Sequence, residues 1–289
     1  MKIIILVPIY NDWQSASKLL EEINSNIAGL DCQFSIIIVN DASSEQQSLS
    51  ALNTENIQSI KIINMNENRG HARCIATGLK HIFEKEEFDY VIPMDGDGED
   101  RPEEIKNFVE YLSYSSDKPI VGERVKRSES LFFKFCYSAH KILTFAFTGQ
   151  SIKFGNYTCL PKSTVEKMIN DKSTWSSFSG ALTKLEKDRS TVPSIRGPRY
   201  FGPSKMSFKN LLIHSLAIIS VFKINVLIRS ILFLIVYMFL IHQNISVIML
   251  IPFPLVILLI GLVFYISRRE SLIDLNNSLS NISNIDNFK

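Results

Sequence analysis

Four carboxylates within six residues give this sequence its sharpest chemical signal. They are Asp95, Asp97, Glu99 and Asp100, and they directly follow the apolar run Tyr90–Met94. Carboxylates at this density repel one another unless a cation neutralises them. Oxygen ligands of this kind suit Mg²⁺ or Mn²⁺, which usually keep water and substrate phosphates in their remaining coordination positions. The run predicts a divalent-metal site that meets a phosphate; the alternative is a solvated acidic turn.

The elements around this run indicate an α/β fold. Short apolar segments alternate with helical patterns, which is typical of a parallel sheet with crossover helices. The expected strands are Lys2–Val7, Phe34–Val39, Ile60–Met65 and Tyr90–Met94, and the expected helices are Gln14–Ile27, His71–Phe83 and one that opens at Pro102. In such sheets ligands bind at the carboxyl ends of strands. Three of those ends are polar, at residues 8–12, 40–44 and 95–100, so we expect the site there.

Two apolar runs near the C-terminus predict a transmembrane hairpin over residues 224–267. At about 1.5 Å per residue, the uncharged second run is long enough to cross roughly 30 Å of hydrocarbon. Pro252 and Pro254 suggest a kink within it. Lys and Arg flank both outer ends and are missing from the connecting turn, which places the large N-terminal region in the cytoplasm. The alternative is a buried helical pair in a large soluble core.

The amino-acid composition excludes several types of protein and of binding partner. The chain has 289 residues, 46% of them hydrophobic, which excludes collagen, low-complexity disorder and a disulfide scaffold. Its 31 basic and 29 acidic residues nearly cancel, so no nucleic-acid partner is expected. The four cysteines lack a C-x-x-C spacing and indicate neither a zinc site nor a redox pair.

The remaining segments predict contacts with lipid. We expect a catalytic domain over residues 1–205 with an interfacial amphipathic helix at about 131–147, a juxtamembrane helix at 206–223, and a polar, mostly mobile cytoplasmic tail at 268–289. Basic residues gather at 121–127 and 196–209. Guanidinium groups there suit docking of a lipid phosphate. The alternative is ordinary juxtamembrane charge held against anionic lipid.

Four motifs, taken in order, resemble family 2 glycosyltransferases of the GT-A fold. They are VPIYND, VNDASS, NENRGHARCIATGL and MDGDGEDRPEE, which lie within the first 125 residues. The resemblance implies a nucleotide-sugar pocket lined by Pro8, Tyr10, Asp12, Asp41, Asn68, Gly70 and Asp95. It further implies Mg²⁺ or Mn²⁺ on Asp95 and Asp97, and we expect Glu99 as an additional ligand. Asp12 stands where the family usually has Glu.

Two later segments resemble the polyprenyl-phosphate branch of that family, which extends the resemblance to about residue 268. The segments are Gly122-x-Arg124 with Arg127, and Arg199-x-x-Gly202-x-Ser204-Lys205. The resemblance implies that the lipid phosphate is bound by Arg124, Arg127, Arg199, Ser204 and Lys205, and that Asp95, Asp97 and Arg199 are catalytic. Glu99 stands where this branch usually has Gln, so its extra charge should tighten metal binding or alter the diphosphate contacts.

The resulting hypothesis is inverting transfer of a sugar from a UDP- or GDP-hexose to undecaprenyl phosphate. The reaction would take place at the cytoplasmic face of the cytoplasmic membrane, for cell-surface glycan synthesis. The main alternative is transfer to a hydroxyl of a lipid-linked oligosaccharide or surface polysaccharide, which needs a general base. In the corresponding stretch, residues 170–175, the one carboxylate that could act as this base is Asp171. A noncatalytic nucleotide-binding scaffold is a third reading. The sequence does not determine which sugar is transferred. It also does not determine the oligomeric state, and a homo-oligomer is compatible with it.

Overall fold

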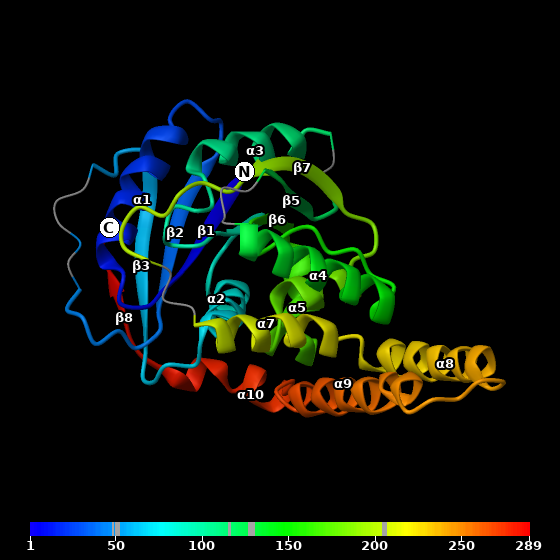
Figure 1. The fold of residues 1–289 in the computed structure, drawn as a ribbon. Coiled ribbons are helices and arrows are strands. Elements are labelled where there is room, and N and C mark those ends of the chain that lie inside the picture. Colours follow the sequence, from blue (N-terminus) through cyan, green and yellow to red (C-terminus); the bar gives the residue numbers. More distant parts are fainter. Residues whose placement is uncertain (48, 50–52, 115–116, 127–130, 204–206) are drawn as a thin grey trace.

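A computed structural model describes residues 1–47, 49, 53–114, 117–126, 131–203 and 207–289 (Figure 1). Arg127, Ser204 and Lys205, three of the predicted lipid-phosphate ligands, lie outside these ranges. Across the described residues, strands form one eight-stranded sheet in the order β7-β5-β6-β4-β1-β2-β3-β8. Helices cover both of its faces, and a pair of long helices extends away from it. The predicted α/β class is therefore confirmed.

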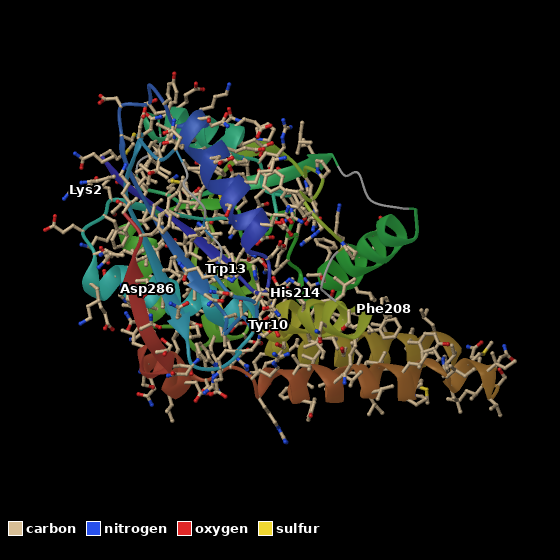
Figure 2. The ribbon with its side chains drawn as sticks, turned by 90° about the vertical axis from the view of Figure 1, so that its left-hand side faces the viewer. Lys2, Tyr10, Trp13, Phe208, His214 and Asp286 are labelled. Carbon is tan, nitrogen blue, oxygen red and sulfur yellow. The ribbon has the colours of Figure 1, made fainter. Side chains whose placement is uncertain are left out.

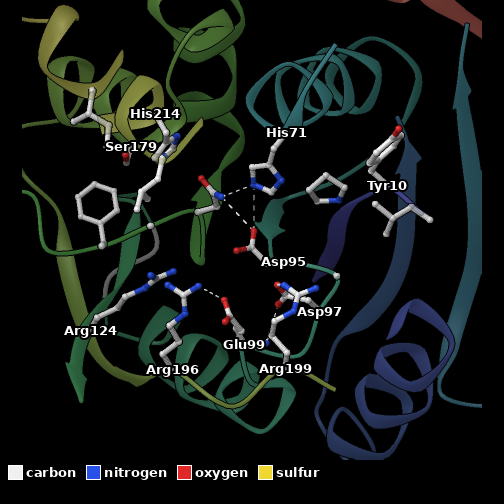
Figure 3. A pocket seen from close by; sticks show the side chains of 18 of the residues that line it. Tyr10, His71, Asp95, Asp97, Glu99, Arg124, Ser179, Arg196, Arg199 and His214 are labelled. Carbon is white, nitrogen blue, oxygen red and sulfur yellow. Dashed lines mark hydrogen bonds and ion pairs between the residues drawn. The ribbon is translucent and has the colours of Figure 1, made fainter. Parts of the chain in front are cut away.

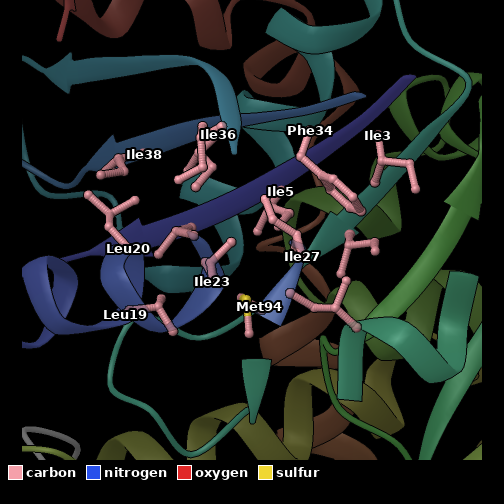
Figure 4. Packing of buried hydrophobic residues seen from close by; sticks show 14 of the residues in the cluster. Ile3, Ile5, Leu19, Leu20, Ile23, Ile27, Phe34, Ile36, Ile38 and Met94 are labelled. Atoms are coloured by element: carbon pink, nitrogen blue, oxygen red, sulfur yellow. The ribbon is translucent and has the colours of Figure 1, made fainter. Parts of the chain in front are cut away.

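The centre of the sheet is parallel. It consists of β1 (Lys2–Ile9), β2 (Gln33–Asn40), β3 (Ile57–Met65) and β4 (Tyr90–Pro93). β1 and β4 are apolar almost throughout, and β2 is apolar from Ile36 to Val39, because both faces of the sheet are covered there. On one face, Ile3 and Ile5 pack with Leu19 and Ile23 of α1 (Trp13–Asn26), as Figure 4 shows. On the other face lies α2 (His71–Lys85).

The other half of the sheet is mixed. β6 (Thr158–Pro161) runs antiparallel to both β4 and β5 (Ile120–Lys126), and β7 (Ser190–Ile195) runs parallel to β5. The helical elements of this half are η1 (Pro102–Glu104), α3 (Ile105–Leu112), α5 (Lys162–Ile169), η2 (Lys172–Trp175) and α6 (Phe178–Leu185). The two halves meet where β4 pairs with β6.

Two helical segments, Lys223–Ile241 and Ile248–Asn276, are long and apolar enough to cross a membrane. Only 11% of each apolar stretch is buried in the protein. They contain α8 (Lys223–Ile241), η3 (Ile248–Leu250) and α9 (Pro252–Ser267), and α8 packs beside α9. Two further apolar helices, α4 (Leu131–Thr148) and α7 (Phe208–Ser220), lie between this pair and the sheet (Figure 1).

Polar side chains at the start of α8 hold the end of α4. Asn225 Nδ2 donates to the Thr148 carbonyl at 3.1 Å, and Arg229 Nη1 donates to the Ala146 carbonyl at 3.1 Å. The last carbonyls of a helix have no intrahelical partner and carry partial negative charge. Asn225 and Arg229, polar residues in an otherwise apolar span, therefore fasten that span to the domain.

The two prolines that were expected to kink the second span stand at the start of α9. α9 begins at Pro252, so Pro252 and Pro254 both fall in its first turn. Backbone nitrogens in the first turn of a helix have no intrahelical acceptor, and proline costs little there.

The expectation of a mostly mobile tail is also wrong. After α9 the chain forms α10 (Leu272–Asn276), η4 (Ser278–Asn281) and β8 (Ile282–Asn287). β8 adds an antiparallel strand to the edge of β3. Leu275 is fully buried against Ala76 and Trp175. The tail is ordered because it satisfies the hydrogen bonds of an open sheet edge and buries one large apolar side chain.

Candidate active site

A cavity of about 390 Å³ lies where β1 and β4 end. Tyr10 and His214 lie at this end of the domain, whereas Lys2 marks the opposite end of β1 (Figure 2). Of the predicted site residues, the cavity brings together Pro8, Tyr10, Asp12, Asp95, Asp97, Glu99, Arg124 and Arg199. The walls also include His71, Asn156, Ser179, Arg196, His214 and Ser215. Asp41, Asn68 and Gly70 are not among the residues that line it.

The acidic run that follows β4 divides into two roles. Asp100 is buried, and its Oδ2 accepts a hydrogen bond from the Asp95 backbone nitrogen at 2.9 Å. This bond joins the two ends of the loop, and the other three carboxylates, Asp95, Asp97 and Glu99, line the cavity. Asp97 Oδ1 accepts from the Glu99 nitrogen at 3.0 Å, which fixes the second half of the loop.

Each carboxylate that faces the cavity has a basic partner (Figure 3). Asp97 forms an ion pair with Arg199, whose second nitrogen lies 3.0 Å from Asp12. Glu99 pairs with Arg196. Asp95 Oδ1 lies 3.2 Å from His71 Nε2 and accepts a hydrogen bond from Asn156 at 3.3 Å. Within the described residues, no three His, Cys, Asp or Glu side chains converge as a metal-ligand cluster.

Burial and mutual repulsion dominate the electrostatics of this loop. Burial, together with the charges of Asp95 and Glu99, raises the pKa of Asp97 to about 6. Burial and Asp95 raise the pKa of Asp100 to about 7. Burial also opposes ionisation of Asp95, but His71 and Arg124 outweigh it and hold the pKa of Asp95 well below its ordinary value. Burial is thus the main reason for the two raised pKa values, and repulsion between neighbouring carboxylates adds to it. The oxygen donors of the loop fit a hard divalent cation.

Asp41 acts on the cavity indirectly. Its two oxygens accept hydrogen bonds from the backbone nitrogens of Arg69 and Gly70, at 2.7 and 2.8 Å. Gly70 has a φ of +89°, a region that favours glycine. Together they set the turn that starts α2 and directs its first residue, His71, into the cavity. Direct contacts of Asp41, Asn68 and Gly70 with a nucleotide stay predictions.

Sequence reasoning missed two groups of cavity residues. His71 follows Gly70 within a motif already singled out, so its position was a usable signal. The second group lies on α7: Leu211, His214, Ser215 and Ile218. The segment of α7 was expected to be a juxtamembrane helix, and nothing in its sequence shows that one face closes the cavity.

The chain belongs to glycosyl transferase family 2. Residues 4–170, more than half of the chain, match the profile of that family. The undecaprenyl-phosphate 4-deoxy-4-formamido-L-arabinose transferase of Klebsiella pneumoniae (strain 342) is 28% identical in an alignment 222 residues long that covers 73% of this chain and 64% of that protein. The transferase of the same name from Salmonella choleraesuis (strain SC-B67) is 27% identical in an alignment 221 residues long that covers 73% of this chain and 64% of that protein. The chain thus spans slightly less than two thirds of these relatives.

Solved structures confirm the fold. Glucosyl-3-phosphoglycerate synthase from Mycobacterium tuberculosis, in complex with Mn²⁺, UDP and phosphoglyceric acid, superposes with a TM-score of 0.55 at 12% identity and covers 78% of each chain. S. aureus TarS 1-349 gives a TM-score of 0.50 at 13% identity over 97% of this chain and 88% of that one. The likeness establishes a GT-A-like fold for this chain, as the motifs predicted.

Proposed function

We propose that this protein is a metal-dependent, inverting glycosyltransferase that moves a sugar from a nucleotide sugar to a polyprenyl phosphate at the cytoplasmic membrane. The observation that carries the proposal is the composition of one cavity. Asp95 and Asp97 line it together with Arg124, Arg196 and Arg199, and α7, which leads into the apolar helix pair, forms part of its wall. A carboxylate edge suits a metal-bound diphosphate, and the arginines suit a second anion.

On the donor side, Asp95 and Asp97 would hold Mg²⁺ or Mn²⁺. When bound, the ion stabilises the negative charge that develops on the departing nucleotide diphosphate. Glu99 turns toward Arg196, so its role as a third ligand is the weakest of the three metal assignments. Tyr10 has 44% of its surface exposed at the cavity rim, where its ring offers a face to the nucleotide base.

On the acceptor side, Arg124, Arg196 and Arg199 would bind and orient the lipid phosphate. Guanidinium groups hold phosphate oxygens through two hydrogen bonds each. A phosphate monoester has a second pKa near ~6 and is largely dianionic at pH 7. Its oxygen can therefore attack the sugar C1 without a general base. Attack opposite the leaving group inverts the anomeric centre and gives a β-linked product from an α-linked donor. Contacts of Arg127, Ser204 and Lys205 with the lipid stay predictions.

The helix pair would anchor this reaction to the membrane, with both outer ends in the cytoplasm. Lys223 begins α8, and the exposed residues Arg268 and Arg269 follow α9, whereas the turn between the helices has no Lys or Arg. This asymmetry supports a cytoplasmic catalytic domain. α4 and α7 would lie at the interface, where the acceptor phosphate resides.

The alternative acceptor, a hydroxyl group, has weaker support. Asp171, the base suggested for it, does not line the cavity. Its Oδ1 accepts from the Ser173 nitrogen at 2.9 Å, and its Oδ2 lies 2.7 Å from Lys184 Nζ. These contacts occupy the carboxylate in capping η2 and favour a structural role.

The function is tested by incubating membranes that contain the protein with a panel of radiolabelled nucleotide sugars and following label into added undecaprenyl phosphate. We expect transfer from one or a few donors, dependent on Mg²⁺ or Mn²⁺ and absent from membranes with Asp97→Asn. Transfer only to hydroxyl acceptors would contradict the proposal, as would no transfer from any donor.

A further inference from the structure

We infer that Tyr200 is a positioning residue that holds Arg199 against the acidic loop, residues 95–100. It does so by fastening the segment 196–202 to α1. We call this segment the arginine arm, because it carries Arg196 and Arg199. The inference rests on the proposed function only for the substrate that Arg199 meets. It assigns a task to a side chain that does not itself line the cavity.

The arginine arm follows the acidic loop through backbone contacts. The Gly197 nitrogen donates to the Glu99 carbonyl at 2.9 Å, and the Tyr200 nitrogen donates to the Asp97 carbonyl at 2.9 Å. The side chains of Glu99 and Asp97 pair with Arg196 and Arg199 of the same arm. Backbone and side-chain bonds thus join the same two stretches, so displacement of the arm moves Arg199 relative to the loop.

The Tyr200 ring packs directly on Gly98. A Cβ atom built on Gly98 would lie 2.5 Å from ring carbons of Tyr200, closer than real contacts allow. Gly98 also has a φ of +86°, which favours glycine. Gly98 is therefore needed both for the turn of the loop and for the seat of the ring.

The far end of the Tyr200 side chain is anchored to α1. Its hydroxyl donates to Glu22 Oε2 at 2.5 Å, and Lys18 Nζ lies 4.6 Å from the ring centroid. Burial and the bond to Glu22 raise the pKa of Tyr200 well above its ordinary value, so the hydroxyl remains a donor.

α1 offers a fixed support for this anchor. Its residues Leu19, Leu20 and Ile23 are buried in the main core against the sheet. Contacts thus run from α1 through Tyr200 to the arginine arm, and they limit the movement of Arg199. Loss of the phenol hydroxyl would free the arm at its outer end while leaving the ring and the cavity residues in place.

The first test measures the arm itself. Tyr200→Phe keeps the ring on Gly98 and removes only the bond to Glu22. Hydrogen exchange of the amides in residues 196–202 of the full-length protein should become about tenfold faster. Glu22→Gln should act in the same direction. Tyr111→Phe, a phenol on α3 that does not line the cavity, is the matched control and should leave exchange unchanged. Equal exchange in Tyr200→Phe and wild type would overturn the inference.

The second test asks whether Tyr200 acts through Arg199. Tyr200→Phe should raise the KM for undecaprenyl phosphate about tenfold, with the nucleotide-sugar KM unchanged. In an Arg199→Ala background the same change should have no further effect, because the group that it positions is gone. An equal loss in both backgrounds, or a shift in the nucleotide-sugar KM alone, would show a general structural role and overturn the inference. A wild-type protein inactive on undecaprenyl phosphate would refute the proposed function, and the exchange test would still decide the role of Tyr200.

Discussion

The two sides of the cavity are assembled in different ways. The carboxylate side comes from loops that directly follow β1 and β4, which are neighbours in the sheet. The arginine side comes from β5, the arginine arm and the loop before β6, and α6 and α7 close the cavity. Strand order alone is enough to form the first side. The second depends on pairs such as Arg199 and Asp97, which are 102 positions apart.

The largest effect should come from the carboxylate side. Asp97→Asn removes a proposed metal ligand and the partner of Arg199 at once. We expect transfer to fall on the order of 10²- to 10³-fold or more, with Mn²⁺ binding weakened in parallel. The control is Asp31→Asn. Asp31 is an exposed carboxylate just before β2, at the amino end of the strand and so at the opposite end from the cavity. Full transfer by Asp97→Asn in the presence of EDTA would rule out the metal assignment.

The arginine side should show a smaller effect that depends on the lipid. Arg199→Ala should lower transfer to polyprenyl phosphate roughly ten- to hundredfold, because a charge-assisted contact contributes about 1.5 to 3 kcal/mol. The loss should appear in the dependence of rate on lipid concentration. Arg199→Lys should restore part of it, since an ammonium keeps the charge and loses the planar fork.

Arg268→Ala serves as the control for this experiment. Arg268 is exposed at the end of α9, so a general membrane anchor would be affected by its loss as much as by loss of Arg199. Free substitution of Arg199 by Lys, or equal effects at both positions, would indicate that Arg199 only holds the protein at the membrane.

The tail should affect stability more than catalysis. Leu275→Ala leaves a cavity against Trp175 and Ala76. A loss of about 2 to 5 kcal/mol in the free energy of unfolding is expected, measured as a lower thermal midpoint in detergent. Ile273→Ala changes a residue of α10 that is 74% exposed and should leave the midpoint unchanged. Equal midpoints for both variants would contradict the packed tail.

The smallest effect on activity is expected from single cysteine substitutions that test the orientation of the helix pair. A cysteine at Gln243, in a background with the native cysteines replaced by alanine, should react with an impermeant thiol reagent on intact cells. A cysteine at Ser271, after α9, should react only after lysis. The opposite pattern would place the arginine side of the cavity across the membrane from the proposed donor.

The carboxylate side could be predicted from the sequence because its information is local. Four expected strands match β1 to β4 within three residues at every end. β1 and β4 are almost continuously apolar, as is β2 from Ile36 to Val39, and each of the three is followed by a polar run. This is the pattern of a buried parallel strand and its loop.

The arginine arm and the tail could not be predicted in the same way. The bond between Tyr200 and Glu22 joins positions 178 apart, and no periodicity reports such a pair. β8 has only its first residue partly buried, so its Asn-rich sequence has no strand pattern. It is a strand because the edge of β3 pairs with it.

The choice of acceptor atom tests the proposed reaction most directly. Purified full-length protein is given one active nucleotide sugar with either undecaprenyl phosphate or undecaprenol, and the products are analysed by mass spectrometry and NMR. We predict a β-linked sugar phosphate from the first lipid and no product from the second. Sugar on undecaprenol, or an α-linked product on the phosphate, would contradict the proposed mechanism.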